Sequence, residues 1–237
     1  MKTSAFTILE IAVCIAVVAI LVSLALPVLG TARLSARQAA SLSGLRQVVA
    51  ATTSYTNDNK EHLPFLATPR QPWEPIRIGD YETYPNSYFL QTGVVLSLLY
   101  PDYLSDRASL LIRDCEWCGG LSDDVVYSRY WMSDTAFAEP PYWAGDTAPD
   151  NLAHYRGMKL GEAALPSLKG LYLDRGMSLQ QLREGSGLGP WMVGRCDGSA
   201  STKPFDIQEY TDIPPRPYLA TPWPVMFTRN GFAGRDF

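Results

Sequence analysis

The residues of this chain whose types and spacing could support chemistry are few, and the clearest are Cys115 and Cys118, which form a CxxC motif. Such a pair can be a redox couple, half of a zinc site or a structural disulfide. A zinc site needs two more ligands, for which Cys196, His62 and His154 are available. A redox pair would open a helix after a strand, whereas two glycines follow this motif and indicate a turn. The context therefore favours a structural disulfide.

Two pairings of these cysteines are open. Either Cys115 forms a disulfide with Cys118, or one of these two forms a disulfide with Cys196 and the other remains a free thiol. A disulfide needs Cα atoms about 4.4–6.8 Å apart, which neighbouring strands readily provide, whereas closing so small a CxxC loop is more strained. We therefore favour Cys196 as one partner, and we expect Cys14, inside an apolar segment, to serve in packing.

Catalytic and ligand-binding patterns are otherwise missing from the sequence. It contains no GxSxG, HExxH or Walker motif, and the glycine-rich residues 185–190 lack the strand, turn and helix order of a dinucleotide site. Asp123-Asp124 and the loop from Asp146 to Asp150 could bind calcium, but without EF-hand spacing we expect surface turns. The thirteen Tyr and six Trp are expected mainly in the core. We expect no catalytic residues, cofactor or metal.

A single carboxylate, Glu10, stands at the edge of a long apolar segment. From Ile11 to Leu29 the sequence has nineteen residues with no charge and one polar side chain, Ser23, within the span of about 17–25 residues that crosses a bilayer. A signal peptide would have a shorter apolar core of about 7–15 residues. A charge in such a segment usually has a partner, so we expect a cationic group near Glu10. Pro27 removes a helical hydrogen bond and predicts a kink near Ser23.

The residues Phe-Thr-Ile-Leu-Glu at 6–10, after a short leader with Lys2 and before this apolar segment, resemble the N-terminus of type IV prepilins and type II secretion pseudopilins. In that family a membrane peptidase cuts before the phenylalanine, the new amine is methylated, and the glutamate pairs with that amine in a filament. The resemblance implies cleavage between Ala5 and Phe6, with Glu10 as the assembly glutamate. Two details differ: Ala5 replaces the usual glycine, and Ile8-Leu9 replace Leu-Ile.

A weaker similarity lies near the C-terminus. Residues 192–200, MVGRCDGSA, are similar to the C-terminal end of an expanded group of bacterial pseudopilin-like proteins with an Asp-Gly motif. Members of that group often have a histidine some ten residues earlier, where this chain has Gly187, so no role of that histidine is carried over.

The resemblance implies a non-enzymatic structural subunit of a type II secretion or type IV pilus-like assembly. Its implied location is the bacterial inner membrane, crossed once, with the head in the periplasm. Its implied partners are prepilin peptidase, other pseudopilin subunits and the inner-membrane secretion platform. The alternative is a membrane-anchored exported binding module or enzyme that uses the stem only as an anchor. With a net charge of −4 and scattered cations, nucleic-acid binding is not expected.

The patterning predicts an α+β fold in which one long helix packs on a mostly antiparallel sheet, and the resemblance implies that this fold is pilin-like with a leader at 1–5. We expect a transmembrane helix at 6–29, a helical extension at 30–57 that packs on the head, and a head domain at 58–237. Strands are predicted at 108–113, 125–132, 170–174 and 191–196, and a short helix at 91–104, interrupted at Pro101. Asp197-Gly198 is a two-residue hairpin signal.

Overall fold

The computed structural model describes residues 8–66, 76–78, 81–83, 95–105, 111–112, 127–144, 154–174, 191–203, 228 and 230–236. The chain divides into two compact units, Met1–Ala40, called the stem unit below, and Ser41–Phe237, called the head unit. One long N-terminal helix and a four-stranded antiparallel sheet give an α+β layout.

Helix α1 spans Ile8–Asp58 and continues through Pro27 without a break. The kink expected there stays a prediction. The helix ends within one residue of the predicted position, and its final carbonyls accept hydrogen bonds from the following turn, where Asn59 N–H donates to Tyr55 and Glu61 N–H to Thr56. Positive φ values at Lys60 and Glu61, 54° and 67°, turn the chain away from the helix axis.

The main sheet of the head unit has the strand order β5-β6-β7-β8, with every neighbouring pair antiparallel. These strands are β5 (Tyr130–Met132), β6 (Gly170–Asp174), β7 (Trp191–Arg195) and β8 (Ala200–Lys203). Strand β6 has the predicted bounds and β7 ends one residue early. Two-stranded antiparallel sheets are formed by β1 (Ile76–Ile78) with β2 (Tyr81–Thr83), and by β3 (Leu111–Ile112) with β4 (Tyr127–Ser128).

The single strand predicted at 125–132 is wrong, because its described part is two strands in different sheets. Strand β4 pairs with β3, β5 pairs with β6, and Arg129 lies between them. The Ser128 hydroxyl donates to the Tyr130 carbonyl at 2.8 Å and accepts from the Tyr130 N–H at 3.3 Å. Such local bonds from a side chain to the backbone compete with a continuous ladder.

The turn between β7 and β8 is longer than the predicted two residues, because three residues, 196–198, lie between the hydrogen-bonded Arg195 and Ser199. The Arg195 N–H donates to the Ser199 carbonyl, and the Gly198 N–H donates to the Arg195 carbonyl. Gly198 has a φ of +88°, which fits a type I turn followed by a left-handed residue. The need for glycine at this position is therefore confirmed, although the loop length is not.

The remaining described elements are short. The helix predicted at 91–104 appears, in its described part, only as the 3-10 turn η2 (Val95–Leu98). Helix α2 spans Pro140–Ala144, and four further 3-10 turns are η3 (Asp134–Phe137), η5 (Leu160–Glu162), η6 (Pro166–Leu168) and η8 (Gly231–Ala233). The predicted strand at 108–113 is described only at β3.

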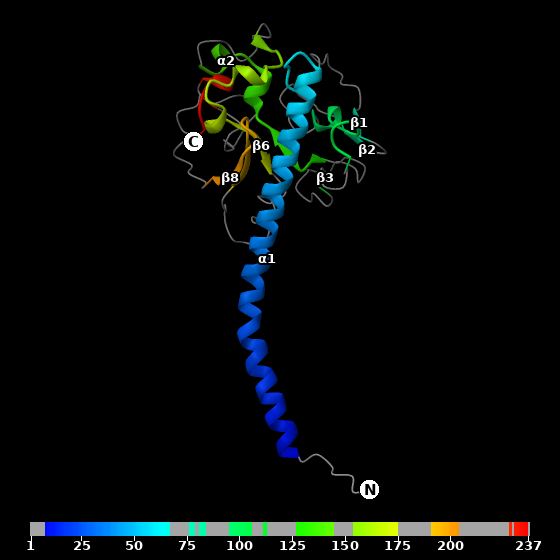
Figure 1. Ribbon diagram of the computed structural model, residues 1–237, viewed down its shortest axis with the longest axis vertical. Helices are drawn as coiled ribbons and strands as arrows, with labels where there is room; N and C mark the ends of the chain where they lie inside the picture. The colour runs from blue at the N-terminus through cyan, green and yellow to red at the C-terminus, as the bar shows by residue number, and fades with distance from the viewer. Residues whose placement is uncertain are drawn as a thin grey trace. The chain divides into compact units, whose positions relative to one another are not determined.

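Within the head unit, α1 runs beside the main sheet (Figure 1) and contacts each of its four strands. Its buried residues recur at helical spacing and lie on one side of the helix. They are Ser41, Leu45, Val48, Val49, Ala51, Thr52 and Thr56. A Cβ on Gly44 would lie 2.1 Å from the Tyr130 hydroxyl oxygen of β5, and one on Gly194 of β7 would lie 2.9 Å from Val49. The Thr52 hydroxyl is 2.8 Å from that of Tyr172 in β6, and Arg46 reaches the Ala200 carbonyl in β8. The predicted helical extension thus packs on the sheet through residues 41–56.

Candidate functional site

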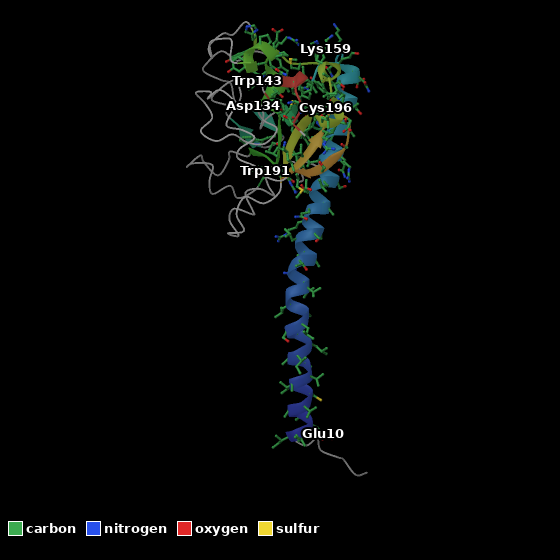
Figure 2. All side chains as sticks on the ribbon, turned by 90° about the vertical axis from the view of Figure 1, so that its left-hand side faces the viewer. Glu10, Asp134, Trp143, Lys159, Trp191 and Cys196 are labelled. Carbon is green, nitrogen blue, oxygen red and sulfur yellow. The ribbon has the colours of Figure 1, made fainter. Side chains whose placement is uncertain are left out.

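The stem unit carries the first candidate site, at Glu10. This residue lies in the first turn of α1, where a carboxylate is favoured by the positive end of the helix dipole (Figure 2). The predicted cleavage residues Ala5 and Phe6 lie outside the described residues. The structure therefore places the predicted assembly glutamate at the start of the helix and leaves the cleavage site as a prediction.

The apolar surface of the stem unit is unusually continuous. Apart from Leu165, every exposed large hydrophobic side chain among the described residues lies between Ile8 and Leu34. Helix α1 is long and apolar enough to cross a membrane, judged by length and composition, a test that a signal sequence also passes. Large exposed apolar surfaces of this kind mark sites of contact with a membrane or with another protein.

Cys196 carries a free thiol in the structure, and the disulfide predicted at this residue stays a prediction because neither of its possible partners is described. Its side chain is buried in the turn after β7, and its N–H donates to the Lys169 carbonyl at 3.0 Å. Burial raises the pKa of this thiol to about 12, while nearby Lys169 acts in the opposite direction. Cys115 and Cys118 lie outside the described residues, so a bridge between those two stays a prediction. Cys14 is exposed on the stem helix.

Of the residues considered as zinc ligands, the structure describes His62, His154 and Cys196, and the two histidines make separate contacts. His62 forms an isolated β-bridge with Lys159, whereas the His154 imidazole lies 3.3 Å from the Glu139 carboxylate. Across the described ranges, no three His, Cys, Asp or Glu side chains gather as metal ligands would. The candidate calcium residues at 123–124 and 146–150, and the glycine-rich residues 185–190, lie outside those ranges.

A buried polar cluster in the head unit was missed by sequence reasoning. Asp236, beyond η8, contacts Lys169 and Gly170 at the start of β6, and Thr228. The Lys169 and Asp236 side chains are 0% and 3% exposed. Lys203 of β8 donates to the main-chain carbonyl of Asp236. No motif marks these residues, because the partners are far apart in the chain and meet only after folding.

Asp134 is a second buried polar residue that the sequence does not single out. Its side chain lies at the start of η3 (Figure 2) and is 1% exposed. In the part of the chain that the structure describes, its Oδ1 atom has no hydrogen-bond partner. Burial raises the pKa of this carboxyl well above its ordinary value. An unpaired buried acid is uncommon in a stable core, and its effect on stability is testable.

Comparison with known proteins finds no matching family model, no matching curated protein and no matching solved structure.

Proposed function

We propose that this chain is a pseudopilin-like structural subunit of a type II secretion or type IV pilus-like assembly. In this proposal the stem is anchored in the bacterial inner membrane, the head is exported to the periplasm, and the chain is not an enzyme. The observation that carries the proposal is the two-part character of α1. Its first part, from Ile8 to Leu34, is mostly apolar and exposed, and one face of its last part is buried against an antiparallel sheet.

The electrostatics of the N-terminus support the same proposal. Cleavage before Phe6 would create an ammonium group close along the chain to Glu10. In a low-dielectric environment a carboxylate is favourable only when a cation is held against it. The partners are then prepilin peptidase, other pseudopilin subunits and the inner-membrane secretion platform.

The assembly role is tested by Glu10→Ala, with Glu61→Ala as the matched control. Glu61 is an exposed carboxylate in the turn after α1, so its loss should affect neither membrane insertion nor assembly. We expect Glu10→Ala to remain in the membrane fraction but to be lost from chemically cross-linked oligomers. If Glu10→Ala cross-links like the wild type, the subunit proposal is overturned and an anchored binding module or enzyme takes its place.

Processing is tested separately by N-terminal sequencing of the protein from its native membrane. The expected mature chain begins at Phe6 and carries a methylated amine. An intact Met1 indicates a plain membrane anchor, and a start beyond Leu29 indicates a conventional signal peptide. Either result contradicts the proposal, whatever the cross-linking experiment shows.

A further inference from the structure

The buried cluster around Asp236 brings an amine, a hydroxyl and a carboxyl group into mutual contact. Lys169 Nζ lies 3.1 Å from Asp236 Oδ2 and donates to Thr228 Oγ1 at 2.6 Å. The Thr228 hydroxyl in turn donates to Asp236 Oδ1 at 2.5 Å, and the Gly170 N–H donates to Oδ2 at 2.9 Å. The Lys169 side chain is fully buried and that of Asp236 is 3% exposed. We infer that Lys169 and Asp236 are a modification site, at which their side chains condense into an intramolecular isopeptide bond.

Burial favours this reaction over a persistent ion pair. Taking an ammonium and a carboxylate out of water costs several kcal/mol per ion, and mutual attraction offsets this only in part. Condensation replaces both charges by a neutral amide. Holding the two groups in contact also removes the entropic barrier of a bimolecular reaction, equivalent to effective concentrations of about 10⁵–10⁸ M in well-oriented cases. The fold therefore supplies both the proximity and the desolvation.

The step is balanced without any other reactant. A proton passes from the Lys169 ammonium to the Asp236 carboxylate, along the path that Thr228 Oγ1 bridges, and leaves a neutral amine and a neutral acid. The amine nitrogen then forms a bond to the side-chain carbonyl carbon of Asp236, and the bond from that carbon to Oδ1 breaks. Oδ1 leaves as water with two protons that were on the lysine nitrogen. Nothing is oxidised or reduced.

The hydrogen bonds already present match those that the amide needs. Oδ2 would become the amide oxygen, and it already accepts from the Gly170 N–H. The amide N–H would donate to Thr228 Oγ1, which already accepts from Lys169 Nζ. The other lysine of the cluster, Lys203, donates to the main-chain carbonyl of Asp236. Two donors on the carboxyl oxygens also polarise the carbon that is attacked.

The bond would close a covalent loop that contains β6, β7 and β8. Such a cross-link restricts the unfolded chain and fixes the C-terminal segment to the sheet. This inference is independent of the proposed assembly role, since it concerns the head unit alone.

The test is tryptic digestion of the unfolded full-length protein, purified in detergent, followed by mass spectrometry. Trypsin cannot cut after an acylated lysine, so residues 160–175 should appear as one peptide that carries Asp236-Phe237 as a branch. The mass of this branched peptide should equal the mass of linear 160–175 plus the mass of Asp236-Phe237, less one water. Recovery of free 160–169 and 170–175 as the main products would overturn the inference.

Variants separate this reaction from other losses of water. Lys169→Arg retains the cation but presents a poor nucleophile, so the branched peptide should vanish. Asp236→Asn should give the same branched peptide as the wild type, because its amide releases ammonia in place of water. Lys203→Arg is the matched control and should retain the branch. Loss of water at Asp197-Gly198 would also make the intact protein lighter by one water than its sequence mass, but it would leave residues 160–175 unbranched. That result would count against the inference.

Discussion

The Ser41 hydroxyl donates a 2.5 Å hydrogen bond to Asp174 Oδ2, joining the first residue of the head unit to the end of β6. Both side chains are fully buried. Arg129, in the break between β4 and β5, adds hydrogen bonds to the same carboxylate from Nε and Nη2 at 3.0 and 2.8 Å. The buried Asp174 is thus held by one hydroxyl from α1 and one guanidinium from beside the sheet.

We predict that Ser41→Ala lowers the free energy of unfolding by about 2 kcal/mol, because it removes a hydrogen bond to a buried charged group. Ser43→Ala is the control, since Ser43 is exposed on the same helix and its loss should change little. Urea unfolding in detergent, followed by tryptophan fluorescence, measures both variants, and all six tryptophans lie beyond residue 70. Equal effects of the two substitutions would show that the Ser41 bond does not stabilise the head unit.

The close approach of Gly44 in α1 to Tyr130 in β5 predicts an unusual response to alanine. Alanine is preferred to glycine in a helix by about 1 kcal/mol. At Gly44, however, the added Cβ would lie 2.1 Å from the hydroxyl oxygen of Tyr130, whose side chain is itself buried. Overpacking of this kind typically costs about 1–3 kcal/mol. We therefore expect Gly44→Ala to lower the urea midpoint.

The matched control is Gly30→Ala in the same helix. An added Cβ at Gly30 has no neighbour within 4 Å, so only the helix preference remains. Circular dichroism should show helix content that is unchanged or higher, with no loss of stability in detergent. If Gly44→Ala behaves like Gly30→Ala, then α1 lies farther from β5 than the structure indicates.

The helices and strands of this fold can be predicted from local sequence patterns only in part. Helix α1 is predictable because Ile11 to Leu29 is apolar and the following residues keep helical spacing up to Asn57. Strand β6 is predictable because an apolar run ends at Asp174. By contrast, β8 is a polar strand indicated only by the Asp197-Gly198 turn before it.

The buried polar contacts could not be predicted in the same way. The bonds from Ser41 to Asp174 and from Gly170 to Asp236 join residues 133 and 66 positions apart. Single residues of these types are mostly surface residues, so their burial depends on partners that only the tertiary structure supplies. The same reasoning applies to Cys196, because its buried position after β7 does not follow from the spacing of cysteines.

Cys196 is expected to be chemically inert in the folded protein. Its pKa is raised from 9.0 to about 12 by burial, which lowers the thiolate population about a thousandfold near neutral pH. We predict that iodoacetamide leaves Cys196 unmodified in the native state and alkylates it in urea. Peptide mass spectrometry of unreduced protein provides the measurement. A peptide joining Cys196 to Cys115 or Cys118 would contradict the structure and restore the disulfide that the sequence favours.

Asp134 should make the head unit less stable as the pH rises. Burial raises the pKa of its carboxyl above 3.8 in the folded state, so the folded chain holds this proton more tightly than the unfolded chain does. Between the two pKa values the folded state binds more protons, and the free energy of unfolding therefore falls with increasing pH. Asp134→Asn has a similar shape and no charge. We predict that it is more stable than the wild type at pH 7, and that its advantage shrinks as the pH falls toward about 4.

The measurement is a series of urea unfolding curves between pH 4 and pH 8 for the wild type, Asp134→Asn and Asp102→Asn. Asp102 is an exposed carboxylate in the turn after η2, so its variant should track the wild type across the series. A difference between Asp134→Asn and the wild type that widens with pH, and is absent for Asp102→Asn, assigns the effect to the buried acid. A difference that stays constant with pH would mean that Asp134 ionises as readily in the folded protein as in the unfolded chain. That result would contradict the prediction, which rests on the burial of Asp134 and on the lack of a hydrogen-bond partner for Oδ1 among the described residues.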